Sequence, residues 1–374
     1  MADTLYFSRD TKVFVEIGNS VWEIPVLDGF SFSQATNTSE ITLNEMSDTS
    51  GNSRRGRRMF NNSYAPAEWS FSTYARPFKS AGTNVAGNAS KDGTTRNHAV
   101  EECLWALMIG DASYTVTTDS VAPDFTGFTA DGTDLDIDFD SSNKTSLGTA
   151  NFYFQLGGAS SGNKTVYKIE GCVVNEASLD FDIDGIATIN WSGFGKIITE
   201  GASAPNATVT EAVSSTANFI RNRLTSLALT TSEGGNHPAT YDLVLTGGSV
   251  TISNNITFLT PETLGVVNQP IGHVTGTRSV SGSFTCYLNS EDNSSAELFE
   301  NLIEDTDSIT NDFELVFKVG GASGTPRVEL NMQACHLEVP THSIEDVISL
   351  ETNFHALPST IEGTNELAIK YVGA

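Results

Sequence analysis

Positive charge is scarce in this sequence. Of its 374 residues, 20 are lysine or arginine and 46 are aspartate or glutamate, which gives a formal net charge of −26. Such an excess of negative charge repels nucleic acid and anionic membranes over most of a protein surface. Sequence-specific DNA binding is therefore disfavoured.

Cysteine is scarce as well, and the four that occur show no C-x-x-C spacing: Cys103, Cys172, Cys286 and Cys335. A zinc site or a disulfide framework needs closely spaced or paired cysteines. We therefore expect four buried, reduced thiols that pack as small apolar groups.

Long apolar runs are missing too. No segment approaches the ~18 consecutive apolar residues of a membrane-spanning helix, and residues 1–12 lack the basic and apolar regions of a signal peptide. We expect a chain made in the cytoplasm of its host, with no membrane partner. Hydrophobic residues make up 39% of the chain, which is typical of a globular protein and not of disorder.

The sequence does contain an internal repeat. Residues 154–174 and 317–337 align without a gap at an offset of 163 positions. The identities include a phenylalanine and a cysteine: Phe154 falls on Phe317, and Cys172 falls on Cys335. A unit that occurs only twice, so far apart, indicates a duplicated domain, since solenoid repeats are ~20–50 residues long.

Matching patterns precede the repeat in both halves. Residues 30–33 pair with 250–253, so that Phe30 falls on Val250, and residues 69–74 pair with 282–287. Alternation of apolar and polar residues indicates strands, and residues 97–109 and 293–303 place apolar residues at helical spacing. We expect a mainly β fold of the α+β type, made of two tandem antiparallel β-sandwich or β-barrel domains, each with one packed α-helix.

The boundaries follow from composition. Residues 201–215 are small, polar and free of periodicity, which is typical of a linker, so the domains are expected at residues 1–200 and 216–374. Residues 111–150 have no counterpart in the second copy. We expect them to form an inserted hairpin on an exposed side.

No catalytic constellation is found. Asp180, Asp182 and Asp184 imitate the start of an EF-hand loop, but the twelfth position is Trp191 where a bidentate glutamate is needed. We expect a strand instead, with Leu179, Phe181 and Ile183 facing the core and the three aspartates on the other face. A second acidic series is expected to behave in the same way: Asp134, Asp136, Asp138 and Asp140.

Two further motifs have ordinary explanations. Residues 158–162 match the G-x-S-x-G of a hydrolase but precede a strand, which favours a hairpin turn. His336, His342 and His355 lie near Cys335 without metal-ligand spacing, so surface histidines are expected. We expect no catalytic, cofactor-binding or metal-binding residues.

A basic cluster stands out in the long polar segment 34–66, namely Arg54, Arg55, Arg57 and Arg58. Nucleic-acid binding, a solvated loop and contact with another copy of the chain all remain open. Because the chain itself is strongly acidic, contact with another copy is favoured.

Two β-rich copies with one helix each, a long polar loop and acidic strand faces resemble the major tail tube protein of long-tailed bacteriophages. The resemblance implies a structural protein of the virion tail, with no enzyme activity and no cofactor. Members form rings that stack into a tube through which DNA passes, and members with two domains form trimers with pseudo-sixfold symmetry.

The resemblance also implies partners and roles. The partners are other copies of the chain, other tail proteins and passing DNA that is not bound specifically. Asp180, Asp182 and Asp184 would line the lumen, because carboxylates repel phosphates. The cluster Arg54, Arg55, Arg57 and Arg58 would contact a neighbouring subunit or ring. A two-domain β-sandwich adhesin and another phage structural protein, of the decoration or baseplate type, remain alternatives.

Overall fold

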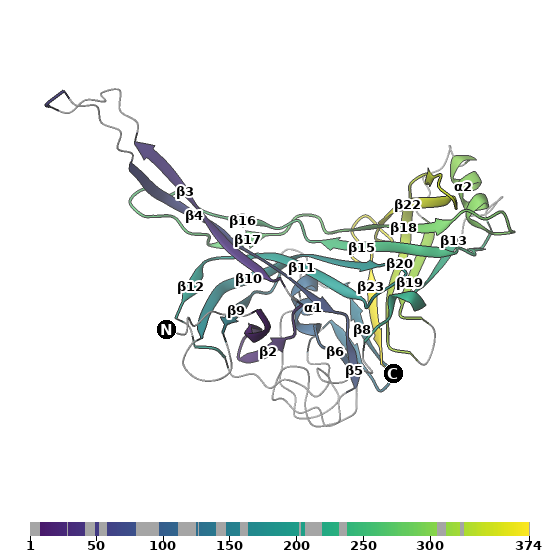
Figure 1. Cartoon of the computed structure of the whole chain (residues 1–374), viewed down its shortest axis with the longest axis horizontal. Coiled ribbons are helices and arrows are strands. Elements are labelled where there is room, and N and C mark those ends of the chain that lie inside the picture. Colours follow the sequence, from purple (N-terminus) through teal and green to yellow (C-terminus); the bar gives the residue numbers. More distant parts are fainter. Residues whose placement is uncertain are drawn as a thin grey trace.

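The computed structural model of the chain consists mainly of antiparallel strands (Figure 1). The residues that it describes are 8–27, 29–41, 49–51, 58–79, 97–110, 125, 127–139, 147–157, 164–201, 203–205, 219–231, 238–304, 312–321 and 325–373. The expectation of a mainly β fold is thus confirmed. We call residues 8–201 the first unit and residues 219–373 the second unit.

The first unit contains a long, regular set of strands and one helix. Its elements are β1 (Lys12–Ile17), β2 (Ser20–Ile24), β3 (Ser31–Ile41), β4 (Arg58–Tyr74), β5 (Pro77–Lys79), β6 (Asn97–Ala99), α1 (Glu102–Ile109), β7 (Phe128–Ala130), β8 (Asp134–Asp138), β9 (Ala150–Leu156), β10 (Thr165–Phe181), β11 (Thr188–Gly195) and β12 (Ile198–Glu200). Helix α1 ends at Gly110, whose φ of 87° is the left-handed conformation that glycine adopts without strain. The start of the expected helix 97–109 instead forms β6 and a turn.

The second unit follows the same plan. Its elements are β13 (Ser226–Thr231), β14 (Thr240–Tyr241), β15 (Leu245–Ser253), β16 (Thr257–Leu259), β17 (Gly272–Val274), β18 (Ser279–Tyr287), α2 (Ser295–Glu304), β19 (Phe313–Val319), β20 (Arg327–Leu337), β21 (Thr341–Ser343), β22 (Ser349–Ala356) and β23 (Ala368–Val372). The strands pair in the order β15–β18–β22–β20–β19–β13–β14. In the first unit the order is β3–β4–β11–β10–β9–β1–β2.

The hairpins that carry the sequence repeat share one register. Cross-strand pairs of the first hairpin and the corresponding pairs of the second are Phe154–Tyr167 and Phe317–Leu330, Phe152–Ile169 and Leu315–Met332, and Ala150–Cys172 and Phe313–Cys335. Both hairpins have a bulge just before the cysteine, where its thiol donates to the carbonyl oxygen three residues earlier, at 3.4 Å in one and 3.8 Å in the other. The duplication remains a prediction, now supported by this shared register.

The same pairings correct one part of the sequence alignment. Corresponding rows across four strands are Phe32–Trp69–Gly193–Val174 and Val250–Gly282–Phe354–Leu337. Val250 is therefore the counterpart of Phe32 and not of Phe30, a shift of two residues. Because side chains alternate with a period of two, the shift leaves the buried face unchanged, and the sequence pattern could not detect it.

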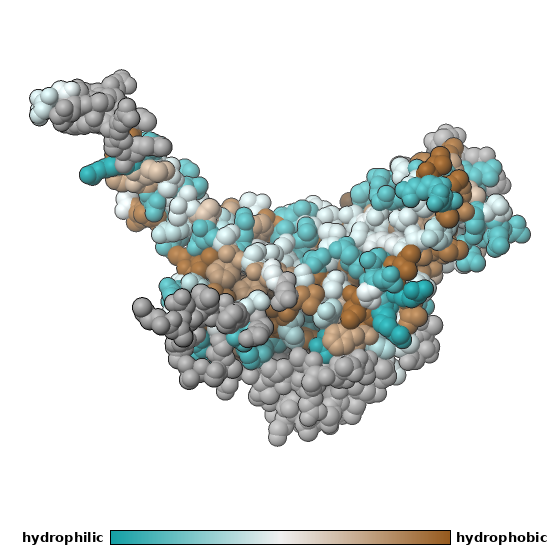
Figure 2. Space-filling model, viewed as in Figure 1, coloured by the Kyte–Doolittle hydropathy of each residue, from teal (hydrophilic) through white to brown (hydrophobic). Residues whose placement is uncertain are grey.

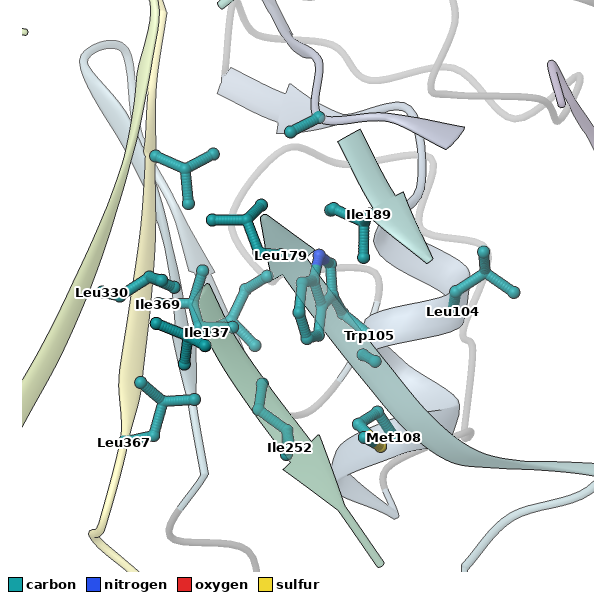
Figure 3. Packing of buried hydrophobic residues seen from close by; sticks show 14 of the residues in the cluster. Leu104, Trp105, Met108, Ile137, Leu179, Ile189, Ile252, Leu330, Leu367 and Ile369 are labelled. Carbon is teal, nitrogen blue, oxygen red and sulfur yellow. The ribbon is translucent and has the colours of Figure 1, made fainter. Parts of the chain in front are cut away.

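The two units are joined by strand pairings and by a common core. The second half of β10 pairs with β11 on one side and with β15 of the second unit on the other. Buried side chains of both units belong to one apolar cluster, in which Leu179 and Ile189 of the first unit lie near Ile252 of the second, with Trp105 of α1 beside them (Figure 3). Expected boundaries at residue 200 and residue 216 thus remain predictions.

The insertion contains the expected hairpin but not in the expected place. Strands β7 and β8 pair, and β8 also pairs with β23 of the second unit. Leu135 and Ile137 are each only 1% exposed, so the prediction of an exposed position is wrong for β8. The apolar half of its alternating pattern is buried beside β23. Residues 111–124, 126 and 140–146, which include Asp140, lie outside the described part.

Candidate functional site: a polar sheet face, two arms and two open strand edges

One face of the shared sheet carries small hydroxyl side chains. Directly paired residues project to the same side of a sheet, so each row of pairs can be followed across the strands. The rows are Ser31–Ser70–Ser192–Glu176–Ser253–Ser279, Ser72–Asn190–Ser178–Thr251–Ser281–His355, and Tyr74–Thr188–Asp180–Ser249–Ser283–Asn353. We call these three rows the hydroxyl face.

The hydroxyl face is poor in charge. Its three rows contain two carboxylates and no lysine or arginine. Pale atoms of near-neutral hydropathy lie along the upper side of the body, over β15 and β18 (Figure 2). Such a face offers phosphate groups weak hydrogen bonds and no cation, and thus has little affinity for nucleic acid.

Of Asp180, Asp182 and Asp184, which were predicted to share one strand face, only Asp180 lies on the hydroxyl face. Asp180 is exposed on the hydroxyl face, where its carboxylate accepts hydrogen bonds from Asn190 Nδ2 at 3.1 Å and Ser178 Oγ at 3.4 Å. Strand β10 ends at Phe181, so Asp182 and Asp184 lie in the turn that leads to β11.

The expectation that Ile183 faces the core is also wrong, because its side chain is 46% exposed. Gly185 has a φ of 111°, and this glycine conformation turns the chain before the strand pattern can continue. Asp184 has Arg223 as a neighbour at 3.6 Å, but both side chains are more than 70% exposed, and such a pair contributes little to stability. Leu179 and Phe181 are buried as predicted.

The hairpin of β3 and β4 extends beyond the body as an arm (Figure 1). We call residues 36–41 and 58–64 the first arm. Arg58 opens β4 and is exposed, whereas Arg54, Arg55 and Arg57 lie outside the described residues. Met59 and Phe60 are each 58% exposed. The arm therefore presents apolar as well as polar side chains.

A second arm, residues 254–278, lies between β15 and β18 and contains the hairpin β16–β17. It packs on the first unit, where Ile256 and the half-buried Phe258 cover Val173 and Phe194. Asn254 Nδ2 donates to the carbonyl oxygens of Met108 at 2.9 Å and Val174 at 3.2 Å.

The two arms also touch each other. The Tyr64 amide donates to the Asn268 carbonyl at 2.9 Å, and the Asn268 amide donates to the Asn62 carbonyl at 3.1 Å. Several side chains of the second arm are exposed and apolar: Leu259, Leu264, Val266, Val267, Ile271 and Val274. Like the first arm, the second arm therefore presents apolar side chains.

Within the described part of the chain, the edges of β3 and of β21 are open. Strand β15 has β10 and β18 as neighbours, whereas its counterpart β3 has β4 alone among the strands of the described part. Residues 339–344, which contain β21, are the counterpart of the second half of β10. Their registers agree, since Ser178–Asn190 and Leu179–Ile189 in the first unit match Thr341–Glu351 and His342–Leu350 in the second. Within the described ranges, β21 has only β22 as a neighbour.

The side chains at the open edges differ in burial from their counterparts. Phe181 is 3% exposed and packs on Phe317 of the second unit, with ring centroids 5.1 Å apart. Its counterpart Ile344 is 79% exposed. Beside β3 lies a cavity of about 550 Å³ whose apolar lining is Ile24, Val26, Leu27, Phe30, Phe32 and Leu156. One edge therefore presents an apolar side chain, and the other presents a cavity whose lining also includes Lys12, Glu23 and Ser31.

The second acidic series is partly neutralised. Lys370 Nζ lies 3.2 Å from Asp134 and 2.9 Å from Asp136. These residues belong to the β8–β23 pairing and not to the hydroxyl face. The expected strand pattern nevertheless holds, since Leu135 and Ile137 are buried and the more exposed Asp134, Asp136 and Asp138 alternate with them.

Sequence reasoning missed a buried polar cluster at the start of α1. Glu101 is fully buried, and Tyr371 Oη donates to its Oε1 at 2.5 Å. Trp105 Nε1 donates to Tyr371 Oη at 2.7 Å, and His98 Nδ1 lies 3.1 Å from Glu102 Oε2. Burial raises the pKa of Glu101 to about 7. Adjacent glutamates before an apolar helix were the available signal.

All four cysteines are free and buried, as expected. Burial raises the pKa of the Cys335 thiol to about 12, which leaves little reactive thiolate. No described helix has the length and apolar character that a membrane crossing requires.

Comparison with known proteins agrees with this geometry. Residues 62–356 match the model of the phage tail tube protein family, and the chain belongs to that family. It is a structural protein of the virion tail, where it assembles with further copies of itself and with other tail proteins, and it is not an enzyme. The adhesin alternative is thereby set aside.

A curated relative is the tail tube protein pb6 of Escherichia phage T5. The two sequences are 30% identical over 378 residues, which cover 97% of this chain and 75% of that protein.

Proposed function

We propose that three copies of the chain form a ring with pseudo-sixfold symmetry, and that stacked rings form a tube that conducts DNA. The observation that carries this proposal is the pair of open edges. Strand β3 is the counterpart of β15, and residues 339–344 are the counterpart of the second half of β10. Inside the chain, β15 and β10 pair with each other and so join the two units.

The contact between copies follows from the contact within one copy. One rotation and translation superposes the first unit on the second. The same operation, applied to the second unit, generates the position of the first unit of another copy, whose β3 then lies beside residues 339–344. This is a head-to-tail contact, which forms a closed ring when the rotation divides a full turn. With a one-sixth turn, three chains supply six units. Ile344 then enters the cavity beside Phe30 and Phe32, as Phe181 enters the second unit.

The hydroxyl face, apart from His355 at its second-unit end, is the wall that we assign to the lumen. It contains Asp180 and lacks cations in its three rows, so it repels the phosphates of a passing duplex more than it binds them. Asp182 and Asp184, which are exposed at the end of the same strand, extend this negative potential. DNA can then slide without specific contacts.

Stacking is the role that we assign to the arms. Arg58 lies on the first arm, which extends away from the body, and Arg54, Arg55 and Arg57 precede it directly in the chain. We propose that these arginines contact acidic residues of a neighbouring subunit or of the next ring. The net charge of −26 makes such partners abundant on every copy.

The edge contact can be tested with Ile344→Asp. A charged group at this position would lie against Phe30 and Phe32, so ring formation should be weakened, while the monomer should keep its melting temperature because Ile344 is exposed. Ile361→Asp is the matched control, since Ile361 is fully exposed, does not line the cavity beside β3 and lies outside residues 339–344. Electron microscopy and analytical ultracentrifugation would compare the two variants with the wild type.

Two results would contradict the proposal. Normal tubes from Ile344→Asp would exclude the pairing of the open edges. A reconstruction with six chains in each ring would exclude the trimer.

A further inference from the structure

Three histidines of the second unit replace apolar residues of the first unit. His336 pairs with His355 at the position where Val173 pairs with Phe194. His342 pairs with Leu350 where Leu179 pairs with Ile189. The chain has six histidines, so half of them occupy counterparts of these apolar residues.

Each replaced residue lies at the junction of the two units. Val173 is 0% exposed, and Ile256 of the second arm belongs to the small apolar cluster that buries it. Phe194 packs on Phe258 of the same arm, with ring centroids 6.4 Å apart. Leu179 lies beside Val250 of β15.

The histidines themselves are exposed. His355 is 52% exposed, and its Nε2 lies 3.4 Å from Glu338 Oε1. Hydrogen bonds from Asn353 and His355 lower the pKa of Glu338. His342 packs edge-on against Phe299 of α2, with centroids 4.4 Å apart. We call His336, Glu338 and His355 the histidine surface.

We propose that the histidine surface is an interaction site for the first arm of an adjacent copy of this chain. The proposal rests on the ring described above and adds where the arm lies and what it contacts. The same movement that places β3 at the open edge places the first arm over the second unit, as the second arm lies over the first unit.

The facing residues of the arm can be named. Val250 is the counterpart of Phe32, so Thr38 and Glu40 stand, by residue count along the strand, where Ile256 and Phe258 stand in the second arm. All residues from Thr36 to Ile41 are exposed. Inside one chain, the second arm makes an apolar contact with the first unit. Between chains, Thr38 and Glu40 of the first arm would instead contact the imidazoles and the Glu338 carboxylate of the histidine surface.

A cross-link tests this placement directly. In Glu40→Cys combined with His355→Cys, oxidation of assembled tubes should join neighbouring chains into dimers and trimers on a non-reducing gel. The four native cysteines are buried and give little background. Glu40→Cys combined with Asn190→Cys is the control, because Asn190 is exposed on the same sheet face but away from the arm, and should give no cross-linked chains.

A charge exchange gives a second measurement. His355→Glu places a carboxylate opposite Glu40, and the concentration at which rings dissociate should rise at least tenfold. Adding Glu40→Lys should return this concentration to its wild-type value, because the lysine of one copy then lies opposite the new glutamate of the next. Asn190→Glu should leave the dissociation unchanged.

The outcomes separate the two proposals. Rings that form without the cross-link, or a defect of His355→Glu that Glu40→Lys does not relieve, would show that the arm lies elsewhere while the ring stands. If wild-type chains form no trimeric rings, the proposed function fails first.

Discussion

Glu101 is a carboxyl group in a place where carboxyl groups are rarely found. It is 0% exposed, and its Oε1 accepts hydrogen bonds from Tyr371 Oη and from the Arg76 amide at 3.2 Å. Tyr371 belongs to β23, so this one side chain connects the start of α1 in the first unit to the last strand of the second. Two donors offset part of the cost of removing the group from water.

Glu101 should make stability depend on pH. Its pKa is about 7 in the folded protein against 4.5 ordinarily, so the folded chain binds the proton more tightly. The stabilisation is fully present below the ordinary value and is lost as the pH rises through about 7. In Glu101→Gln, the unfolding free energy relative to wild type should therefore increase by about 2 kcal/mol between about pH 5 and about pH 8.

Chemical denaturation at several pH values would measure this dependence. Glu351→Gln, at an exposed position, is the control and should show no such trend. A constant difference between Glu101→Gln and wild type would mean that Glu101 titrates with an ordinary pKa.

At the scale of elements, periodicity predicted which segments form half-buried strands, but it did not predict where those strands end. The alternation of Leu179 and Phe181 with acidic residues correctly predicted a half-buried strand. It failed at Ile183 because Gly185 turns the chain, and a turn glycine inside an alternating pattern does not reveal which residue is the last of the strand. Leu135 and Ile137 were correctly placed on an inserted hairpin, but their burial depends on β23, more than 200 residues later in the chain. Pairings over such distances leave no local signal.

The first arm is the element whose charge we expect to matter for stacking. Replacing Arg54, Arg55, Arg57 and Arg58 with serine should shorten tubes and leave the melting temperature of the monomer unchanged, because Arg58 is exposed and the arm on which it lies extends beyond the body. Wild-type stacking should approach that of the variant at about 1 M salt, where screening reduces the range of charges to ~3 Å.

Tube lengths in negative-stain images over a salt series would measure the effect. Serine in place of Lys164, Lys168, Lys196 and Arg223, which lie outside the first arm, is the comparison for an equal change in total charge. Tubes of normal length from the arginine variant would favour the solvated-loop reading of the cluster.

At the scale of the whole molecule, the hydroxyl face gives the lumen assignment its test. Asp180→Lys, Asp182→Lys and Asp184→Lys together replace repulsion of phosphates with attraction. Tubes should still assemble, since all three side chains are exposed, but DNA should leave the particles more slowly, most strongly at low salt.

The rate of DNA ejection from purified particles would decide the matter. Lysines in place of Glu291, Asp292 and Glu297, near α2, change the charge equally at positions off the hydroxyl face. Ejection at the wild-type rate with lysines at 180, 182 and 184 would show that this end of β10 does not line the channel.

The pairing of β10 with β15 has one more consequence, which concerns concentration. Because both strands belong to one chain, their pairing is intramolecular and does not depend on the concentration of the protein. In the ring that we propose, the junction of β3 with residues 339–344 would instead join two copies, so its extent would depend on concentration. Dilution should therefore separate rings into chains that keep the pairing of β10 with β15 intact.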